Sequence, residues 1–304
     1  MKGPHGLVEL QASPDLAAPI LVHSLAGFLD AGSAGRLAVE HLLSVLDSEP
    51  VAEFDIDVLF DYRARRPRMT FLTDHYGEID LPRLRVDQLQ DEAGQSFLLL
   101  HGPEPDFRWR GFASDTVWLV KELDVSLVIG MHAVPWPAPH TRPVNVTAHS
   151  NNPSLVADRR HFVGDLEVPG HVAGMLELWL SDAAVPAMGF AAHVPHYLAG
   201  ANYPRAAVAL LEALSAQTGL MFPLDGLREQ AQTADDEISL QVAGEAENVE
   251  AITMLEQQYD DFMTRLEHPE ATAEDDTDIA AMDPEEFVDQ VERFLANRER
   301  YDKE

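Results

Sequence analysis

The clearest pattern of apolar and polar positions lies near the middle of the chain. Two short apolar runs, at residues 97–100 and 125–129, have the length of strands buried on both faces of a parallel sheet and are too short for helices. Between them, residues 106–124 carry apolar side chains on one side, as a crossover helix does. Each run ends in a polar, proline-rich loop, at 101–106 and 130–143. This is the pattern of a βαβ unit, whose loops leave the carboxyl ends of strands, where open α/β sheets bind ligands.

The same reading predicts elements on both sides of this unit. Strands are expected at residues 20–25, 51–60, 69–79, 84–89 and 183–194. Helices are expected at residues 33–46, 170–181 and 203–218, with a further helix start near 151–154. Ser33 is the expected cap of the first helix and Asp106 that of the crossover helix, and 69–79 is expected to pair with 84–89. The fold predicted is α/β, with a mostly parallel sheet flanked by helices and a C-terminal helical extension.

The character of the chain changes near residue 221. Residues 222–304 hold 25 Asp and Glu against 6 Lys and Arg, which predicts an α/β core over 1–221 and an acidic helical region over 222–304. Apolar residues between 249 and 266 recur every three or four positions, a narrow stripe suited to packing on a partner helix. An acidic linker is expected at about 268–282, followed by a last helix. The stripe predicts a homo-oligomer or a docked helical arm.

Composition excludes several classes of function. A net charge of −31 disfavours nucleic acid and membrane as partners, because phosphate binding relies on clustered Lys and Arg. The chain has only three lysines, which counts against a lysine-based ATP site. The absence of cysteine removes disulfides and thiolate chemistry and fits the cytoplasm. No signal peptide and no membrane-spanning run is seen.

Several residues could carry chemistry. The glycine-rich loop at 27–35 precedes a helix, where free N–H groups suit an anion, but its spacing matches no phosphate-binding motif and close packing of strand and helix is the favoured explanation. Arg63, Arg65 and Arg66 stand out in an acidic chain and are expected to form an interaction or anion contact. Histidines gather at or beyond predicted strand ends: His101, His132, His140, His149, His193 and His196. Their spacing matches no recognised ligand motif, so no metal and no cofactor are expected.

Four segments together resemble the proteasome assembly chaperone 2 family, in particular its actinobacterial branch. They are Gly-Phe-Leu-Asp-Ala-Gly at 27–32, Asp-Tyr-Arg-Ala-Arg-Arg-Pro at 61–67, Leu-His-Gly-Pro-Glu-Pro-Asp at 100–106 and Pro-His-Thr-Arg-Pro at 139–143. The resemblance covers about residues 18–265. It implies a phosphorylase- or hydrolase-like α/β topology with C-terminal helices and a homo-oligomer, and some relatives help to assemble the proteasome core. Labels of ATP-grasp or carboxylate–amine ligase have been attached to such proteins, but the paired ATP-binding lysines are missing here.

Two functions remain open at this point. The first is a non-enzymatic oligomeric interaction or assembly protein in the cytoplasm, with itself or another protein as partner. The alternative is an enzyme on a nucleoside-phosphorylase-like scaffold that binds an anionic small molecule. Both place a ligand crevice at the strand ends, with these expected residues: Gly27, Asp30, Gly32, His101, Glu104, His132, His140 and Arg142. Within it, His101 and Glu104 are expected to be structural, and Arg142 is the expected anion contact.

Overall fold

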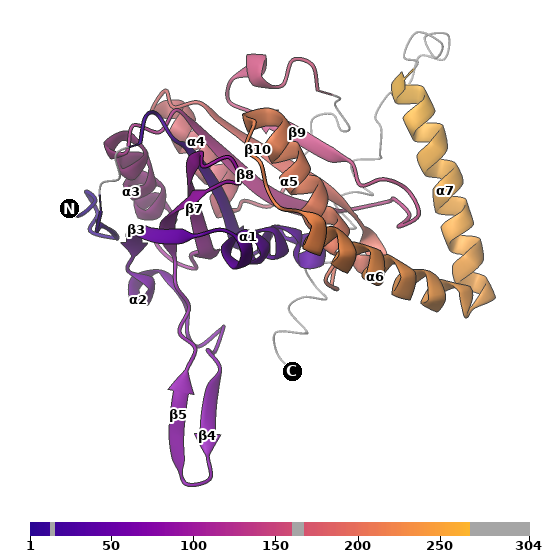
Figure 1. The fold of residues 1–304 in the computed structure, drawn as a ribbon, viewed down its shortest axis with the longest axis horizontal. Coiled ribbons are helices and arrows are strands. Elements are labelled where there is room, and N and C mark those ends of the chain that lie inside the picture. Colours follow the sequence, from indigo (N-terminus) through magenta and orange to yellow (C-terminus); the bar gives the residue numbers. More distant parts are fainter. Residues whose placement is uncertain (13–15, 160–166, 268–304) are drawn as a thin grey trace.

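The computed structural model describes residues 1–12, 16–159 and 167–267. Its centre is an eight-stranded mixed sheet, drawn in Figure 1. In sheet order the strands are β1 (Val8–Leu10), β3 (Ser48–Phe54), β6 (Arg85–Gln90), β7 (Ser96–Pro103), β2 (Ile20–Ala26), β8 (Leu127–Trp136), β10 (Ala187–Pro195) and β9 (Val146–Ser150). The four strands from β7 to β10 are parallel, and the remaining pairs are antiparallel. The predicted α/β fold with a parallel centre is confirmed.

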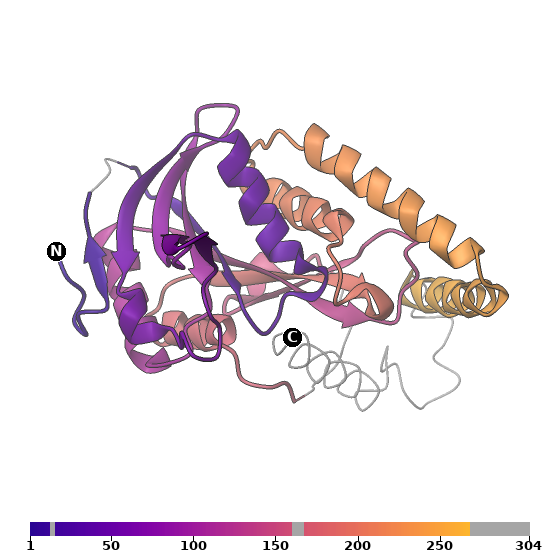
Figure 2. The same cartoon turned by 90° about the horizontal axis from the view of Figure 1, so that it is seen from below.

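Helices cover both faces of the sheet (Figure 2). One face packs on α1 (Ala34–Val45), α5 (Pro204–Thr218) and α6 (Asp225–Ala243). The other packs on α3 (Trp109–Glu122) and α4 (Val172–Asp182). Short turns of helix complete the list: α2 (Ile56–Leu59), η1 (Ala31–Ser33), η2 (Pro153–Leu155) and η3 (His196–Leu198). Within the described ranges, no helix combines the length and apolar character needed to cross a membrane.

The last described helix, α7 (Ala246–Glu267), carries the predicted apolar stripe. Its C-terminal half docks on the molecule's own surface, where Tyr259 is buried beside Val134 and Trp136. Towards its start Val249 stays 45% exposed. The linker expected at 268–282 and the helix after it lie outside the described residues. Leu227 and Ala231 of α6 belong to the main core, so the division of the chain at residue 221 stays a prediction.

A hairpin stands away from the rest of the molecule. Strands β4 (Met69–Leu72) and β5 (His75–Ile79) pair only with each other and form the elongated projection in Figure 1, called the arm below. The expected pairing of residues 69–79 with 84–89 was therefore wrong. Segment 69–79 contains its own turn at Thr73 and Asp74, whereas β6 is taken up by β3 and β7.

Other local expectations also need correction. The strand expected at 51–60 ends at Phe54, because Ile56 and Leu59 have helical spacing and lie in the single turn of helix α2. The strand expected at 125–129 runs on to Trp136. Beyond Gly130 it pairs with β10, and its other edge has only an isolated bridge between Ala133 and Asp30 among the described residues, so that edge tolerates Pro135. The helix start expected near 151–154 is the single turn η2, and the preceding strand β9 was missed.

Neither residue predicted as a helix cap makes a capping bond, although Ser33 does occupy the position before α1. Ser33 has φ 51° and makes no cap bond; instead the Asp30 carboxylate accepts the N–H groups of Gly35 at 2.6 Å and Arg36 at 3.1 Å. An Asp a few residues earlier can reach these donors because Gly32, at φ 64°, turns the chain sharply. Asp106 accepts from the Asp61 N–H and from Arg65, and α3 begins three residues later.

Candidate functional site

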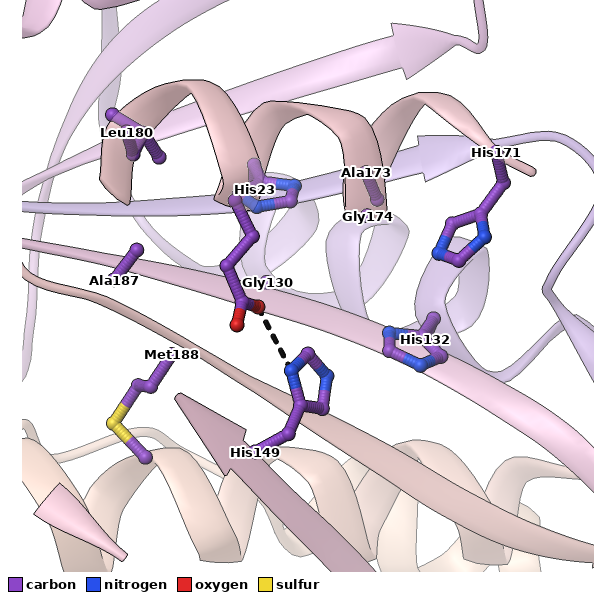
Figure 3. Close-up of a pocket in the computed structure, with 11 residues that line it drawn as sticks. His23, Gly130, His132, His149, His171, Ala173, Gly174, Leu180, Ala187 and Met188 are labelled. Atoms are coloured by element: carbon purple, nitrogen blue, oxygen red, sulfur yellow. Dashed lines mark ion pairs between the residues drawn. The ribbon is translucent and has the colours of Figure 1, made fainter. Parts of the chain in front are cut away.

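Four imidazole rings meet between α4 and the sheet. They belong to His23 of β2, His132 of β8, His149 of β9 and His171 just before α4, and are called the histidine cluster below (Figure 3). The ring centroids of His132 and His149 are 5.5 Å apart, and those of His132 and His171 are 6.1 Å apart. Three strands and the start of one helix, distant from one another in sequence, therefore bring titratable groups to one place.

The sheet makes room for these rings with glycine. Gly130 and Gly189 are register partners in β8 and β10, and they lie between His23 of β2 and His149 of β9 in one row across four strands. A Cβ on Gly130 would lie 2.9 Å from the His23 ring, and one on Gly189 would lie 2.4 Å from the His149 ring. The His23 ring therefore lies over the backbone of Gly130, and the His149 ring lies over the backbone of Gly189.

Helix α4 closes the cluster from above. Its Glu177 carboxylate pairs with Nδ1 of His149 at 2.8 Å, and Gly174 leaves space for the His171 ring. Nδ1 of His171 lies 3.3 Å from the Pro169 carbonyl oxygen. The cavity that remains is about 10 Å³, close to the minimum that holds one water molecule. The site therefore has no room for a substrate while α4 is in place.

Burial sets the charge of the cluster. It lowers the pKa of His23 to about 4; Glu177 opposes this shift, and His149 and His171 add to it. Burial lowers the pKa of His132 well below its usual value, helped by the three neighbouring imidazoles, and that of His171 is lowered mainly by burial too. These three side chains are neutral at pH 7. Among the residues that the structure describes, no three His, Cys, Asp or Glu side chains are placed to hold a metal ion.

The predicted crevice residues near the glycine loop hold the backbone together. Glu104 accepts the Phe28 N–H at 3.0 Å and the Val172 N–H at 2.7 Å, so it joins the loop after β2 to the start of α4. Its side chain lies against Gly27, where a Cβ would meet it at 2.2 Å. Asp30 and Gly32 shape the start of α1, as described above. Each of these carboxylates already accepts two backbone donors.

The other predicted residues lie in separate surroundings. His101 Nε2 is 2.8 Å from the buried Asp87 carboxylate, which also pairs with Arg85 at 2.9 Å. Nδ1 of His140 lies 2.8 Å from the Tyr197 hydroxyl. Arg142 reaches α7, where it pairs with Asp260 at 2.7 Å and Glu256 at 3.2 Å. Of the eight crevice residues, His132 alone lies in the histidine cluster, and the role of Arg142 as an anion contact stays a prediction.

The three predicted contact arginines lie at the foot of the arm. Arg65 bonds the Glu104 carbonyl at 2.8 Å and the Asp106 carboxylate at 2.7 Å. Arg63 and Arg66 are exposed, and their role as an interaction or anion contact stays a prediction.

Sequence reasoning missed three members of the site. His23 lies inside a predicted strand, His171 begins a predicted helix and Glu177 lies within that helix, so none of them stood at a strand end. One signal was available. Gly130 and Gly189 interrupt two strongly apolar strands, and glycine inside a strand often marks the close approach of another group. Of the six histidines singled out by sequence, His132 and His149 meet here.

Comparison with known proteins places the chain in a wider group. The family model described as PAC2 family matches residues 24–242. A Mycobacterium tuberculosis protein of unknown function is 44% identical, with a TM-score of 0.82, over 85% of this chain and 92% of that one. A Corynebacterium glutamicum protein of unknown function is 34% identical, with a TM-score of 0.81, over 86% and 99%.

A third structure carries a functional description. It is a Mycobacterium tuberculosis proteasome-assembly chaperone homologue, 29% identical with a TM-score of 0.70, over 77% of this chain and 99% of that one. No curated protein matched the sequence. The family model covers well over half of the chain, and the chain belongs to the PAC2 family.

Proposed function

We propose that this chain is a non-enzymatic assembly protein that binds other protein chains, its own copies included, through the arm. The observation that carries the proposal is the exposure of large apolar side chains on both strands of a hairpin that projects from the body (Figure 1). Phe71 is 60% exposed and Tyr76 is 73% exposed, with Met69, Leu72 and Ile79 beside them. Contiguous apolar surface of this kind marks an interaction site.

The physics of a hairpin supports the same conclusion. A two-stranded hairpin is marginally stable in water, and a third strand or another surface is needed for independent stability. In the arm every residue from Met69 to Ile79 is exposed. The contacts it contains are local, such as the edge-on pairing of Phe71 with Tyr76 at 5.2 Å. A surface that covers the arm would therefore both order it and remove its apolar side chains from water.

A second copy of this chain is the occupant that we infer. Arg63, Arg66 and Arg68 are exposed at the foot of the arm, whereas the chain as a whole carries a net charge of −31. A second copy offers an acidic surface to these arginines, and complementary charge steers association and sets its orientation. The product is the homo-oligomer that the sequence predicts.

The residues of the predicted crevice favour binding over catalysis. Asp30 and Glu104 each accept two backbone N–H groups, and Arg142 is shared between two carboxylates of α7. A general acid or base needs a free position within reach of a substrate. The description of one relative as a proteasome-assembly chaperone homologue supports the assembly role. We place this role in the cytoplasm, because a chain without cysteine suits a reducing compartment.

The test is the mass of the protein in solution. Sedimentation velocity of the full chain, over a range of micromolar concentrations, should give a species larger than the 33.6 kDa monomer. The double variant Phe71→Ser, Tyr76→Ser should shift it to the monomer, because both rings leave the proposed contact. Met254→Ser is the matched control, since Met254 is 56% exposed on α7, away from the arm.

Two results would contradict the proposal. A wild-type protein that sediments as a monomer at every concentration removes self-association. An oligomer that survives in the arm variant, but dissociates in the Met254→Ser control, moves the contact to α7. If the wild type is monomeric and the intact arm captures a different protein chain, the occupant is a foreign partner and the second copy is wrong.

A further inference from the structure

The histidine cluster has an unusual balance of charged groups. Four imidazoles face one small cavity, one each from β2, β8, β9 and the start of α4. In the part of the chain that the structure describes, the acids that act on them are Glu177 of α4 and, at the amino end of that helix, Glu104. Glu104 is already occupied by two backbone N–H groups. One available carboxylate cannot balance several imidazolium ions in a buried space, because an uncompensated charge there is costly.

The two sides of the cluster are joined in a way that lets them separate. His23, His132 and His149 stand on the rigid sheet, whereas His171 and Glu177 move with α4. Residues 167–170, which lead into α4, are exposed, so few contacts fix the chain before the helix. The helix itself has 11 residues and buries Val172, Leu176 and Leu180. Helix α4 can therefore move away from the cluster without loss of strand pairing in the sheet.

We propose that the histidine cluster is a pH-dependent contact: in its neutral form it holds α4 on the sheet, and protonation of its imidazoles releases α4. Positive charge then gathers on the sheet, on His23 and on His132 in the neighbouring strand. A cavity the size of one water molecule cannot hydrate these ions. Lifting α4 lets water reach them, and it also exposes the apolar side of the helix.

The sign of the effect follows from the direction of the shifts. The pKa of His23 in the folded protein is lowered to about 4 from 6.5, so the closed state favours the neutral ring. That stabilisation is complete above pH 6.5 and is lost as the pH falls towards 4. For this histidine alone, linkage gives about a 20-fold rise in opening between pH 7 and pH 5. His132 and His171, whose pKa values are also lowered, act in the same direction.

Amide hydrogen exchange of the full-length protein tests this inference. After correction for intrinsic exchange rates, protection of the α4 amides should fall at least 10-fold between pH 7 and pH 5. The α4 amides should be less protected than the α5 amides, on the other face of the sheet, at both pH values, because α4 opens before the whole chain unfolds. His132→Phe removes one imidazole while His23 and His171 remain, so the fall in α4 should be smaller than in the wild type but not abolished. His75→Gln, at an exposed histidine of the arm, is the matched control and should behave as the wild type.

Other outcomes would overturn the inference. Equal protection of the α4 and α5 amides at pH 5 would mean global acid unfolding, and constant protection in α4 would mean that no release occurs. If His132→Phe fails to fold, proton NMR titration of the wild-type imidazoles replaces it; rings that protonate near pH 6.5 while α4 stays protected contradict the proposal. A rise in Tm of 5 °C or more on adding Zn²⁺ at pH 7.5, unaffected by His75→Gln, would instead make the cluster a metal site.

Discussion

Apolar side chains are usually buried and polar ones exposed, and the arm and the histidine cluster depart from this rule in opposite ways. The arm places large apolar residues in water, with Tyr76 73% exposed. The cluster places titratable residues in the interior, with His23 only 5% exposed. Folded chains rarely keep either arrangement without compensation, since apolar patches attract partners and buried polar groups need bonds. Each region therefore depends on something beyond local packing: a second surface for the arm, and a pH that leaves the rings neutral for the cluster.

Helix α7 also carries an apolar surface, but that surface is covered by the rest of the same chain. Its stripe is apolar as well, but Tyr259 and its neighbours pack on Val134 and Trp136 of the same chain. The difference is one of geometry. The stripe of α7 folds back beside β8, whereas the arm points away from the body (Figure 1). An apolar pattern in sequence thus predicts that a surface will be covered, and not which chain covers it.

The largest expected effect concerns the pH dependence of global stability. Lowering the pH from 7 to 4.5 should reduce the free energy of unfolding by about 2–3 kcal/mol through His23 alone, because its folded pKa is about 4 and its unfolded pKa 6.5. Urea denaturation of wild type and His23→Leu at both pH values measures this contribution. The pH-dependent loss should be smaller in His23→Leu by that amount. An equal loss in both proteins would show that burial of His23 does not govern acid stability.

An intermediate effect is expected at α7. The Tyr259 hydroxyl donates to the Pro143 carbonyl oxygen at 3.1 Å and accepts from Asn145 Nδ2 at 2.9 Å. Tyr259→Phe keeps the ring and removes both bonds, so it should cost about 1 kcal/mol. Urea denaturation measures the loss, and limited proteolysis at the α6–α7 junction reports whether α7 undocks first. A stability unchanged from wild type would mean that these two hydrogen bonds do not contribute to holding α7 in place.

The smallest effect is expected on the monomer when the arm is altered. Phe71→Ser with Tyr76→Ser should change the free energy of unfolding by less than about 0.5 kcal/mol at concentrations where the wild type is dissociated, as for surface substitutions. The same variant should abolish association, so the two readouts separate. Calorimetry on dilute samples measures the first quantity. A cost above about 1.5 kcal/mol would show that the arm packs against its own body.

The sequence predicted the parts of the fold that depend on short-range pattern. Buried strands such as 97–100 and 183–194 and helices such as 203–218 were recovered because apolar runs and periodicity report burial directly. Ser33 makes no cap bond because Asp30 takes the first N–H groups of α1 across the turn at Gly32, whereas Asp106 is occupied by Asp61, a partner that only the tertiary fold supplies. The arm was misassigned because the same alternation suits a sheet edge and a free hairpin.

The candidate site was harder to predict for a related reason. A row such as His23–Gly130–Gly189–His149 exists only once strands that are distant in sequence have paired in register. Expecting ligands at strand ends drew attention to the loops, whereas these rings lie within strands and under a helix. His132 and His149 were named, but nothing in their spacing connected them with His23 or His171.

The way in which the arm joins the sheet has an evolutionary consequence. Strands β3 and β6 are antiparallel neighbours, so a short turn between them would complete the sheet. The chain instead leaves for the arm and returns at one place, where the Asp80 N–H donates to the Arg68 carbonyl oxygen at 2.9 Å. A segment whose ends meet can be lengthened, shortened or exchanged at little cost to the scaffold. The arm can therefore change between relatives, and with it the partner that is recognised, while the core stays under the same selection.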